Sequence, residues 1–394
     1  MTRAGQLLAA LGFLALGFAP SPPPAKLYVL AVGGGPEPKH NQVAIESNVR
    51  YFDRAKPTTA DLRVLFTSGD KNEENVLCLD DKGKEYYRKP DLPRLDGPAH
   101  LETVKTELAN LAEKVKQNPS SGAFLYFTGH GSPNRAGNLN NNHFDLWDKQ
   151  RLTVTDLAAA LASFPKQQPV TLLMVECYSG SFGNVLFEGG LPDAPLAEGK
   201  VCGFFASVQQ RMAAGCTPNV NEAEYRDFTG YFLAALTGKD RLGRDAGGAD
   251  YDKNGRIGMD EAFAYCLLND NSIDTPVCTS DVFLRRFVTT ADEQIMATPF
   301  SEVRKWARPA QLVALDGLSS ALKLEGEDRL QTAYKTFRGN PVDADKMPAV
   351  HAIRFVRLAK TIVLQHQLAE TGAPDIKRRF ADLLKLEAAN PLRN

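Results

Sequence analysis

The sequence predicts an α/β protein with three layers and a mostly parallel sheet, followed by an α-helical C-terminal region. Short continuous apolar runs, such as residues 124–127 and 171–175, are typical of parallel strands buried on both faces. Amphipathic helical patterns separate these runs, and this alternation favours a parallel sheet covered by helices. From about residue 301 onward the apolar residues follow helical spacing only.

In chain order, strands are expected at 26–32, 63–67, 124–127, 171–175 and 201–206, where apolar and β-prone residues are continuous. Helical spacing of apolar residues predicts helices at 42–54, 100–115, 153–164, 225–236 and 259–268. Polar residues with proline and glycine predict a long surface loop at 70–97, and an Asn- and Gly-rich stretch predicts another at 134–142. C-terminal helices are expected at 302–325, 328–338, 348–368 and 375–389.

The composition is that of an ordinary globular protein with one large or two medium domains. The chain has 394 residues, of which 24% are charged, and a formal net charge of −1. This balance gives no indication of a nucleic-acid partner or of an anionic membrane surface. We expect three parts: a signal segment at 1–25, an α/β domain at 26–300 and a helical region at 301–394.

The N-terminus has the pattern of a secretory signal. Arg3 precedes an apolar run at 7–19, and prolines follow between residues 20 and 24. The run is too short to span a bilayer comfortably, so cleavage near Ala25 is expected, and an uncleaved anchor is the alternative. We therefore expect an exported protein that contacts a membrane only through this segment, if at all.

Export makes the six cysteines informative, because disulfides form in oxidising compartments. The short-loop pairings are Cys202 with Cys216 and Cys266 with Cys278. These two bridges would leave Cys177 free for chemistry and Cys78 unpaired. The alternative is six reduced and mostly buried thiols.

A histidine and a cysteine follow the two central apolar runs. His130 comes after 124–127, and Cys177 comes after 171–175. Ligands of open α/β sheets bind at the carboxyl ends of the strands, so these side chains converge if the two strands are neighbours. A thiol attacks a carbonyl as the thiolate, and an imidazole supplies the proton that a departing amine needs. The N–H groups of Cys177 and Gly131 are candidates for holding the oxyanion.

These two blocks resemble the clan CD cysteine peptidases, the group of caspases and legumains. The segment 126–133 (YFTGHGSP) is similar to the legumain-type branch and its bacterial relatives, and 176–182 (ECYSGSF) resembles that branch's cysteine turn. The resemblance covers roughly residues 26 to 290. It implies a caspase-like fold, a His130–Cys177 dyad, and a substrate-pocket strand at 205–207 that makes Ser207 a substrate-binding candidate.

The sequence also departs from that family. An acidic residue usually stands two positions before the cysteine and a small one just before it, where this chain has Val175 and Glu176. A glutamate beside the thiol disfavours the thiolate if its side chain points inward. The alternative is that it points away, because neighbouring residues on a strand point to opposite faces. Residues 39–41 occupy the region of the legumain asparagine pocket without matching it, so asparagine specificity is not carried over.

Residues 250–261 (DYDKNGRIGMDE) fit the pattern of an EF-hand calcium loop. The pattern assigns a sharp turn to Gly255, and the glycine-rich residues 243–249 give no entering helix. The alternative is a turn that caps the following helix. No cofactor is expected for catalysis itself, so a calcium ion here would have a structural role. The predicted ligands are the side chains of Asp250, Asp252, Asn254 and Glu261 and the carbonyl of Arg256.

Taken together, the sequence predicts an exported caspase-like cysteine endopeptidase acting on peptide or protein substrates. Two alternatives remain, namely a catalytically silent binding protein on the same fold and a transamidase or peptide ligase. Legumains carry a helical C-terminal extension that occludes the active site. The helical region of this chain is similar to it only in class, so a packing or partner-binding module is the alternative.

Overall fold

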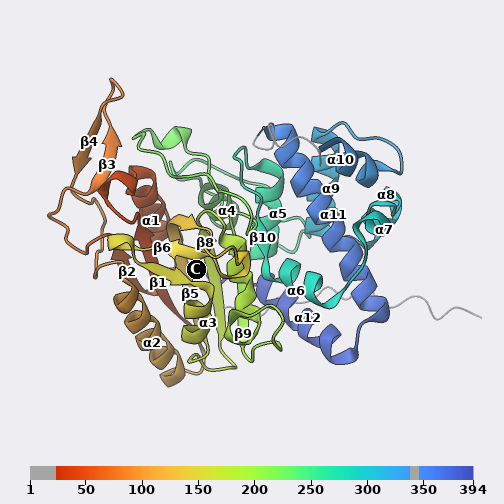
Figure 1. Ribbon diagram of the computed structural model, residues 1–394, viewed down its shortest axis with the longest axis horizontal. Coiled ribbons are helices and arrows are strands. Elements are labelled where there is room, and N and C mark those ends of the chain that lie inside the picture. The colour runs from red at the N-terminus through yellow and green to blue at the C-terminus, as the bar shows by residue number, and fades with distance from the viewer. Residues whose placement is uncertain (1–23, 338–345, 394) are drawn as a thin grey trace, which may run out of the picture.

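The computed structural model describes residues 24–337 and 346–393 (Figure 1). The predicted signal segment lies outside them, apart from its last two residues. Within the described residues, each helix is either too short or too polar to cross a lipid bilayer.

The centre of the molecule is a sheet with the strand order β10-β9-β8-β5-β1-β2. Every neighbouring pair is parallel except β10 and β9, which are antiparallel. This confirms the predicted α/β class with a mostly parallel sheet. Two short strands, β6 (His143–Asp145) and β7 (Arg151–Thr153), continue it from β5 as an antiparallel ladder. The strands of the main path are β1 (Lys26–Gly34), β2 (Asp61–Phe66), β5 (Ser121–Ser132), β8 (Pro169–Val175), β9 (Lys200–Phe205) and β10 (Val277–Cys278).

Helices bury both faces of the sheet, which explains why its strands are continuously apolar. On β5, Phe124 and Tyr126 point to the face covered by α1 (Val43–Ala55) and α4 (Phe228–Thr237). The alternate residues Leu125 and Phe127 point to the face covered by α2 (Leu101–Gln117) and α3 (Val154–Leu161). Phe52 of α1 stacks on Tyr126 with 4.4 Å between ring centroids.

A bundle of helices lies beyond β9 and β10 on one side of the sheet (Figure 1). Side chains of this bundle join the same hydrophobic cluster as β9, and α12 contacts β9 directly. The bundle consists of α5 (Met259–Asn269), α6 (Thr279–Phe287), α7 (Asp292–Met296), α8 (Phe300–Trp306), α9 (Pro309–Ala321), α10 (Arg329–Phe337), α11 (Met347–Thr371) and α12 (Pro374–Glu387).

One prediction for these helices was wrong, and two helices were missed. The single helix expected at 302–325 is divided into α8 and α9, because Pro309 has no amide hydrogen and disfavours a helical conformation at the residue before it. Helices α6 and α7 were not predicted. The packing role for the C-terminal region is favoured over occlusion, because its helices pack on the rest of the bundle and on the sheet edge. Helix α12 contacts β9 and α6, α9 contacts α5, and α11 contacts α6.

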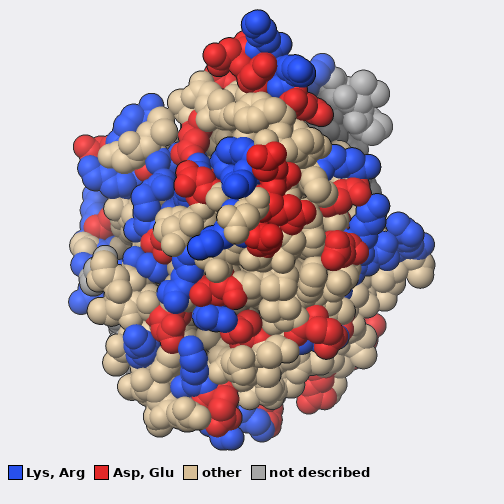
Figure 2. Space-filling model, turned by 90° about the vertical axis from the view of Figure 1, so that its left-hand side faces the viewer, with Lys and Arg blue, Asp and Glu red and all other residues tan. Residues whose placement is uncertain are grey.

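The predicted loop at 70–97 contains a β-hairpin. Its strands are β3 (Val76–Leu79) and β4 (Glu85–Arg88), which pair with each other and project from the body of the protein (Figure 1). Tyr86 and Tyr87 on β4 are exposed, so the apolar alternation that marks a strand is weak here. On the face of the molecule drawn in Figure 2, basic and acidic side chains are intermixed.

All six cysteines are free thiols, so neither predicted disulfide is formed. Cys202 is level with Thr171 and Phe124 near the start of the strands. Cys216 instead contacts the carbonyl of Gly129, five residues beyond Phe124 and therefore roughly 16 Å further along β5. Cys278 contacts the hydroxyl of Ser280 at 3.2 Å rather than a second sulfur.

Candidate active site

The carboxyl ends of β5 and β8 bring His130 and Cys177 to the same edge of the sheet. The last ladder pair of these neighbouring parallel strands is Thr128 with Val175. His130 and Cys177 each stand two residues beyond that pair, so they start level from adjacent strands, as the sequence predicted. A Cβ atom on Gly131 would lie 2.2 Å from the carbonyl oxygen of Cys177. Only glycine allows this close approach of the two backbones.

The imidazole of His130 is oriented by Gln42, the residue that precedes α1. The side-chain oxygen of Gln42 lies 2.9 Å from Nε2 of His130. An amide oxygen only accepts hydrogen bonds, so Nε2 carries the proton and Nδ1 is the basic nitrogen of the neutral ring. Burial and the side chain of His40 lower the pKa of His130 below its ordinary value of 6.5, with Asp145 and a hydrogen bond to the His40 backbone acting in the opposite direction. The ring is therefore a neutral base at physiological pH.

The sulfur of Cys177 lies against the backbone of Ala213. The Ala213 N–H donates to Sγ at 3.3 Å, and the thiol lies 3.6 Å from the Ala213 carbonyl oxygen. Burial raises the pKa of this thiol above 9.0, and the Ala213 amide opposes that shift. Among the described residues, the hydrogen-bond partners of the sulfur are these backbone groups and not His130. In this conformation the pair is a thiol and a neutral imidazole.

The turn after β8 places the thiol at a sharp corner. Tyr178 adopts a left-handed conformation with φ of 62°, which is strained for a residue with a side chain. Its N–H is held by the carbonyl of Arg211 at 2.8 Å, and the 3₁₀ helix Ser179–Leu186 begins directly afterwards. Within this turn the strain falls on the residue next to the candidate nucleophile.

Glu176, which departs from the family pattern, is buried with both carboxylate oxygens unpaired. Burial, together with the charge of Asp145, raises its pKa well above 4.5. Burial therefore favours the uncharged carboxyl, which opposes the thiolate of Cys177 less than a carboxylate would. Its Cγ would lie 2.7 Å from a Cβ on residue 131, so it packs beneath Gly131.

The structure corrects the prediction for Ser207. This residue is completely buried, and its hydroxyl is bonded to the carbonyl of Met212 at 3.0 Å and lies 3.2 Å from the hydroxyl of Thr275. Ser207 follows β9 as expected, but residues 211–214, which we call the covering segment, lie over it. Its side chain therefore holds this segment and does not face a substrate. The sequence could not show that a later segment folds back over this position.

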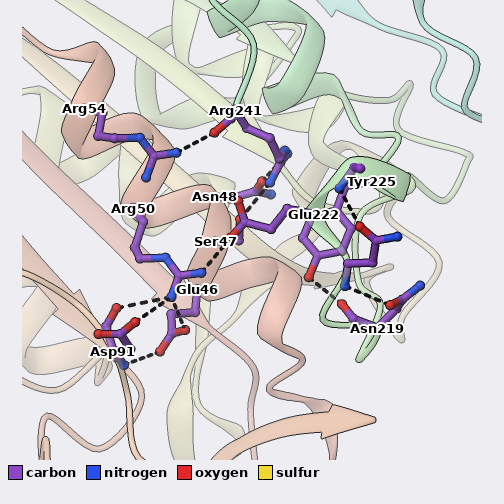
Figure 3. Close-up of polar contacts among 12 residues, drawn as sticks. Glu46, Ser47, Asn48, Arg50, Arg54, Asp91, Asn219, Glu222, Tyr225 and Arg241 are labelled. Atoms are coloured by element: carbon purple, nitrogen blue, oxygen red, sulfur yellow. Dashed lines mark hydrogen bonds and ion pairs between the residues drawn. The ribbon is translucent and has the colours of Figure 1, made fainter. Parts of the chain in front are cut away.

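Helix α1 is fixed against the segment that follows β9 (Figure 3). Gln42 directly precedes this helix, so the same contacts stabilise its position. The N–H of Ala44 donates to the carbonyl of Thr217, and Arg50 pairs with Glu222 at 2.7 Å. Arg241 is buried and forms an ion pair with Asp227. The same guanidinium donates to the side chains of Ser47 and Asn48 on α1.

The loop at 250–261 brings carboxylates together as the calcium pattern predicts. One oxygen each from Asp250, Asp252 and Glu261 lie within 4.8 Å of one another. Gly255 adopts a φ of 78°, and no helix enters the loop, in agreement with the sequence. Oxygen ligands in this arrangement suit calcium, so the site fits the ion, and calcium binding stays a prediction. Of the other predicted ligands, the Asn254 side chain contacts Asp252 at 2.7 Å.

Comparisons with known proteins give only distant similarities. No protein-family model and no curated protein matches the sequence. A solved structure of protein GSU0716 from Geobacter sulfurreducens is 14% identical, with a TM-score of 0.37, and the match covers 64% of this chain and 92% of that one.

Two structures of a secreted C11 cysteine protease from Bacteroides thetaiotaomicron are similar at the same distant level. The first, in complex with an irreversible peptide inhibitor, is 14% identical with a TM-score of 0.30, and the match covers 70% of this chain and 72% of the protease chain. The second is 10% identical with a TM-score of 0.33, and the match covers 71% of this chain and 70% of the protease chain. Similarity at this level does not transfer an activity to this chain.

Three further residues of the site were missed by the sequence analysis. Gln42 was assigned only to a helix, Ala213 carries no reactive group, and Asp274 lies far along the chain. Asp274 is completely buried and accepts the N–H of Ala214 at 2.6 Å. Each acts through a contact between segments that are distant in sequence, so no local pattern marks them.

Proposed function

We propose that this protein is a cysteine peptidase that cleaves peptide bonds through Cys177 and His130. The observation that carries the proposal is the level placement of these two residues beyond the last ladder pair of adjacent parallel strands, with the backbones of Gly131 and Cys177 in contact. The similarity of residues 126–133 and 176–182 to clan CD peptidases supports the same assignment, and so does the predicted export of the chain.

In the proposed reaction, Nδ1 of His130 accepts the thiol proton as Sγ of Cys177 attacks the carbonyl carbon of the peptide. The N–H groups of Gly131 and Cys177 are proposed to stabilise the oxyanion. The imidazolium then protonates the departing amine, and water attacks the acyl-enzyme with His130 again acting as base.

One observation favours an alternative, namely a binding protein without catalytic activity: among the described residues the sulfur of Cys177 contacts Ala213 and not His130. Hydrolysis of a peptide library by the wild type, Cys177→Ala and His130→Ala separates the two functions. We expect turnover in the wild type only, with the melting temperatures of both variants close to the wild type. Capture of an added amine by the acyl-enzyme would indicate a transamidase or ligase.

A well-folded wild type without turnover on any library member would leave the binding function. Retained turnover in either variant would remove that residue from the mechanism. Pretreatment of the wild type with iodoacetamide is the chemical control, because modification of the Cys177 thiol abolishes a thiol-dependent activity.

A further inference from the structure

One fully buried arginine connects the C-terminal helices to the loop that follows α5. Arg354 on α11 has no exposed side-chain surface. Its Nε donates to the carbonyl of Asp274 at 2.8 Å, and Nη1 donates to the carbonyl of Asp270 at 2.6 Å. Nη2 donates to the carbonyl of Ser272 at 3.1 Å. The planar guanidinium has donors in fixed directions, so it sets the positions of three backbone carbonyls at once.

The loop that Arg354 holds, residues 270–275, also supports the covering segment. The carboxylate of Asp274 accepts the N–H of Ala214 at 2.6 Å and the N–H of Phe228 at 3.0 Å. Thr275 lies 3.2 Å from the hydroxyl of Ser207, which in turn donates to Met212. Loop 270–275 therefore fixes the residues on both sides of Ala213, whose N–H donates to the sulfur of Cys177.

We propose that Arg354 is a positioning residue for Cys177: it holds loop 270–275 so that the N–H of Ala213 remains directed at the sulfur. A hydrogen bond donated to the sulfur favours the thiolate, so the arginine raises the acidity of the thiol without touching it. The C-terminal helices are then part of the active-site scaffold. The inference rests on the proposed function for its meaning, but thiol acidity is measured without any substrate.

Charged and titratable groups lie near both Arg354 and Cys177. Nη2 of Arg354 lies 3.7 Å from Oδ2 of Asp270, an oxygen with no hydrogen-bond partner. Burial and Asp270 raise the pKa of Asp274 well above its ordinary value, and Arg354 opposes that shift, so loss of the guanidinium favours the protonated acid. Protonation weakens the hold of Asp274 on Ala214, and it also removes a charge that raises the pKa of Cys177, so the midpoint reports the balance of the two effects. The titratable groups that interact electrostatically with Cys177 are Glu176, Asp274 and Cys216, and those that interact with Arg354 are Asp270, Asp274, Cys266 and His351.

The test is the pH dependence of Cys177 alkylation by iodoacetamide in the full chain. The modified peptide is followed by mass spectrometry, so that the other cysteines do not contribute. The variants are Arg354→Met, Arg354→Lys and the control Arg357→Met. Arg357 lies one turn along α11, and its Nη2 pairs with Asp281 at 2.7 Å instead of contacting loop 270–275. Melting temperature and far-ultraviolet circular dichroism report folding.

We expect Arg354→Met to move the alkylation midpoint about one pH unit higher, the size expected for loss of one hydrogen bond to a charged group. Arg354→Lys should move it less, and Arg357→Met should leave it unchanged. A folded Arg354→Met with the wild-type midpoint, or an equal shift in Arg357→Met, would overturn the role.

If Arg354→Met does not fold, Arg354→Lys decides: a shifted midpoint supports the role and a wild-type midpoint overturns it. Failure of both to fold, while Arg357→Met folds, would assign Arg354 to folding alone and so overturns the positioning role. None of these outcomes depends on peptide hydrolysis, so a missing peptidase activity would be recognised separately.

Discussion

The side-chain oxygen of Gln42 lies 2.9 Å from Nε2 of His130, and this contact determines which imidazole nitrogen is the base. Without this contact, the neutral ring is free to rotate and to carry its proton on Nδ1. An Nδ1 that already carries a proton cannot accept the thiol proton. We therefore expect Gln42→Leu to lower kcat by about tenfold or more, with KM little changed. This loss is part of the rate enhancement that general acid–base catalysis usually contributes.

The matched control for this prediction is Gln311→Leu. Gln311 accepts the N–H of Arg308 at the start of α9, so its loss affects the C-terminal helices and not the imidazole. A kcat for Gln42→Leu equal to that of the control would show that the contact does not direct catalysis. Gln42→Glu should raise the pKa of His130, because a carboxylate stabilises the imidazolium.

The pH profile of kcat/KM follows from the two pKa shifts. The neutral imidazole is the active base, and its pKa lies below 6.5, so activity should be lost only as pH falls below that value. The thiol pKa lies above 9.0, so the neutral pair persists up to that pH and an alkaline decline is expected beyond it. The expected profile is a broad plateau across neutral pH. An acidic limb with its midpoint above pH 7 would contradict a buried, neutral His130.

The strands that carry His130 and Cys177 were predictable from the sequence because burial on both faces leaves a direct signal. Residues 124–127 and 171–175 are continuously apolar, and in the structure both lie between two helical layers. A residue just past each run was therefore placed correctly at the sheet edge. The order of the strands was not predictable, since it depends on crossovers rather than on composition.

The rest of the site depends on contacts that have no local signature. Arg354 is a charged residue in an amphipathic helix, and its complete burial is possible only because loop 270–275 offers it several carbonyl oxygens. Likewise, Cys202 and Cys216 are close in sequence, yet they lie near opposite ends of the strands. Sequence separation was therefore a poor guide to which cysteines could pair.

The buried ion pair between Arg241 and Asp227 is expected to dominate the stability of the contact between α1 and the segment after β9 (Figure 3). Asp227 is completely buried, so Arg241→Met leaves its charge without a counter-ion. We expect the free energy of unfolding to fall by about 3–5 kcal/mol, the usual effect of removing one partner from a buried pair. Urea denaturation measures the change.

Arg54→Met is the control for that measurement. Arg54 is exposed; among the described residues it donates to the backbone carbonyl of Arg241 and lies over the ring of Tyr51, so its loss should change stability by about 0.5 kcal/mol or less. Similar losses in the two variants would mean that the buried pair contributes no more than a surface contact.

Calcium is expected to stabilise the fold through the loop at 250–261. The carboxylates of Asp250, Asp252 and Glu261 already converge, and Glu261 accepts the N–H groups of Tyr251, Asp252 and Gly258. An ion that binds only the folded state stabilises it by about 2.7 kcal/mol at a free concentration one hundred times Kd. Calcium should therefore raise the melting temperature of the wild type, and chelation should reverse this.

Glu261→Gln should abolish most of the calcium effect, because the bidentate carboxylate is the ligand that an amide replaces least well. Glu325→Gln, at an exposed position outside the loop, should retain the calcium effect.

Turnover should persist on chelation while the protein stays folded, since the loop opens α5 and contributes no group to the contacts of Cys177. A wild-type melting temperature indifferent to calcium would leave the loop as a turn that caps α5. Loss of turnover without unfolding would instead connect the ion to the active site. Helix α5 could carry that effect, because it runs from this loop to Asp270, whose carbonyl accepts a hydrogen bond from Arg354.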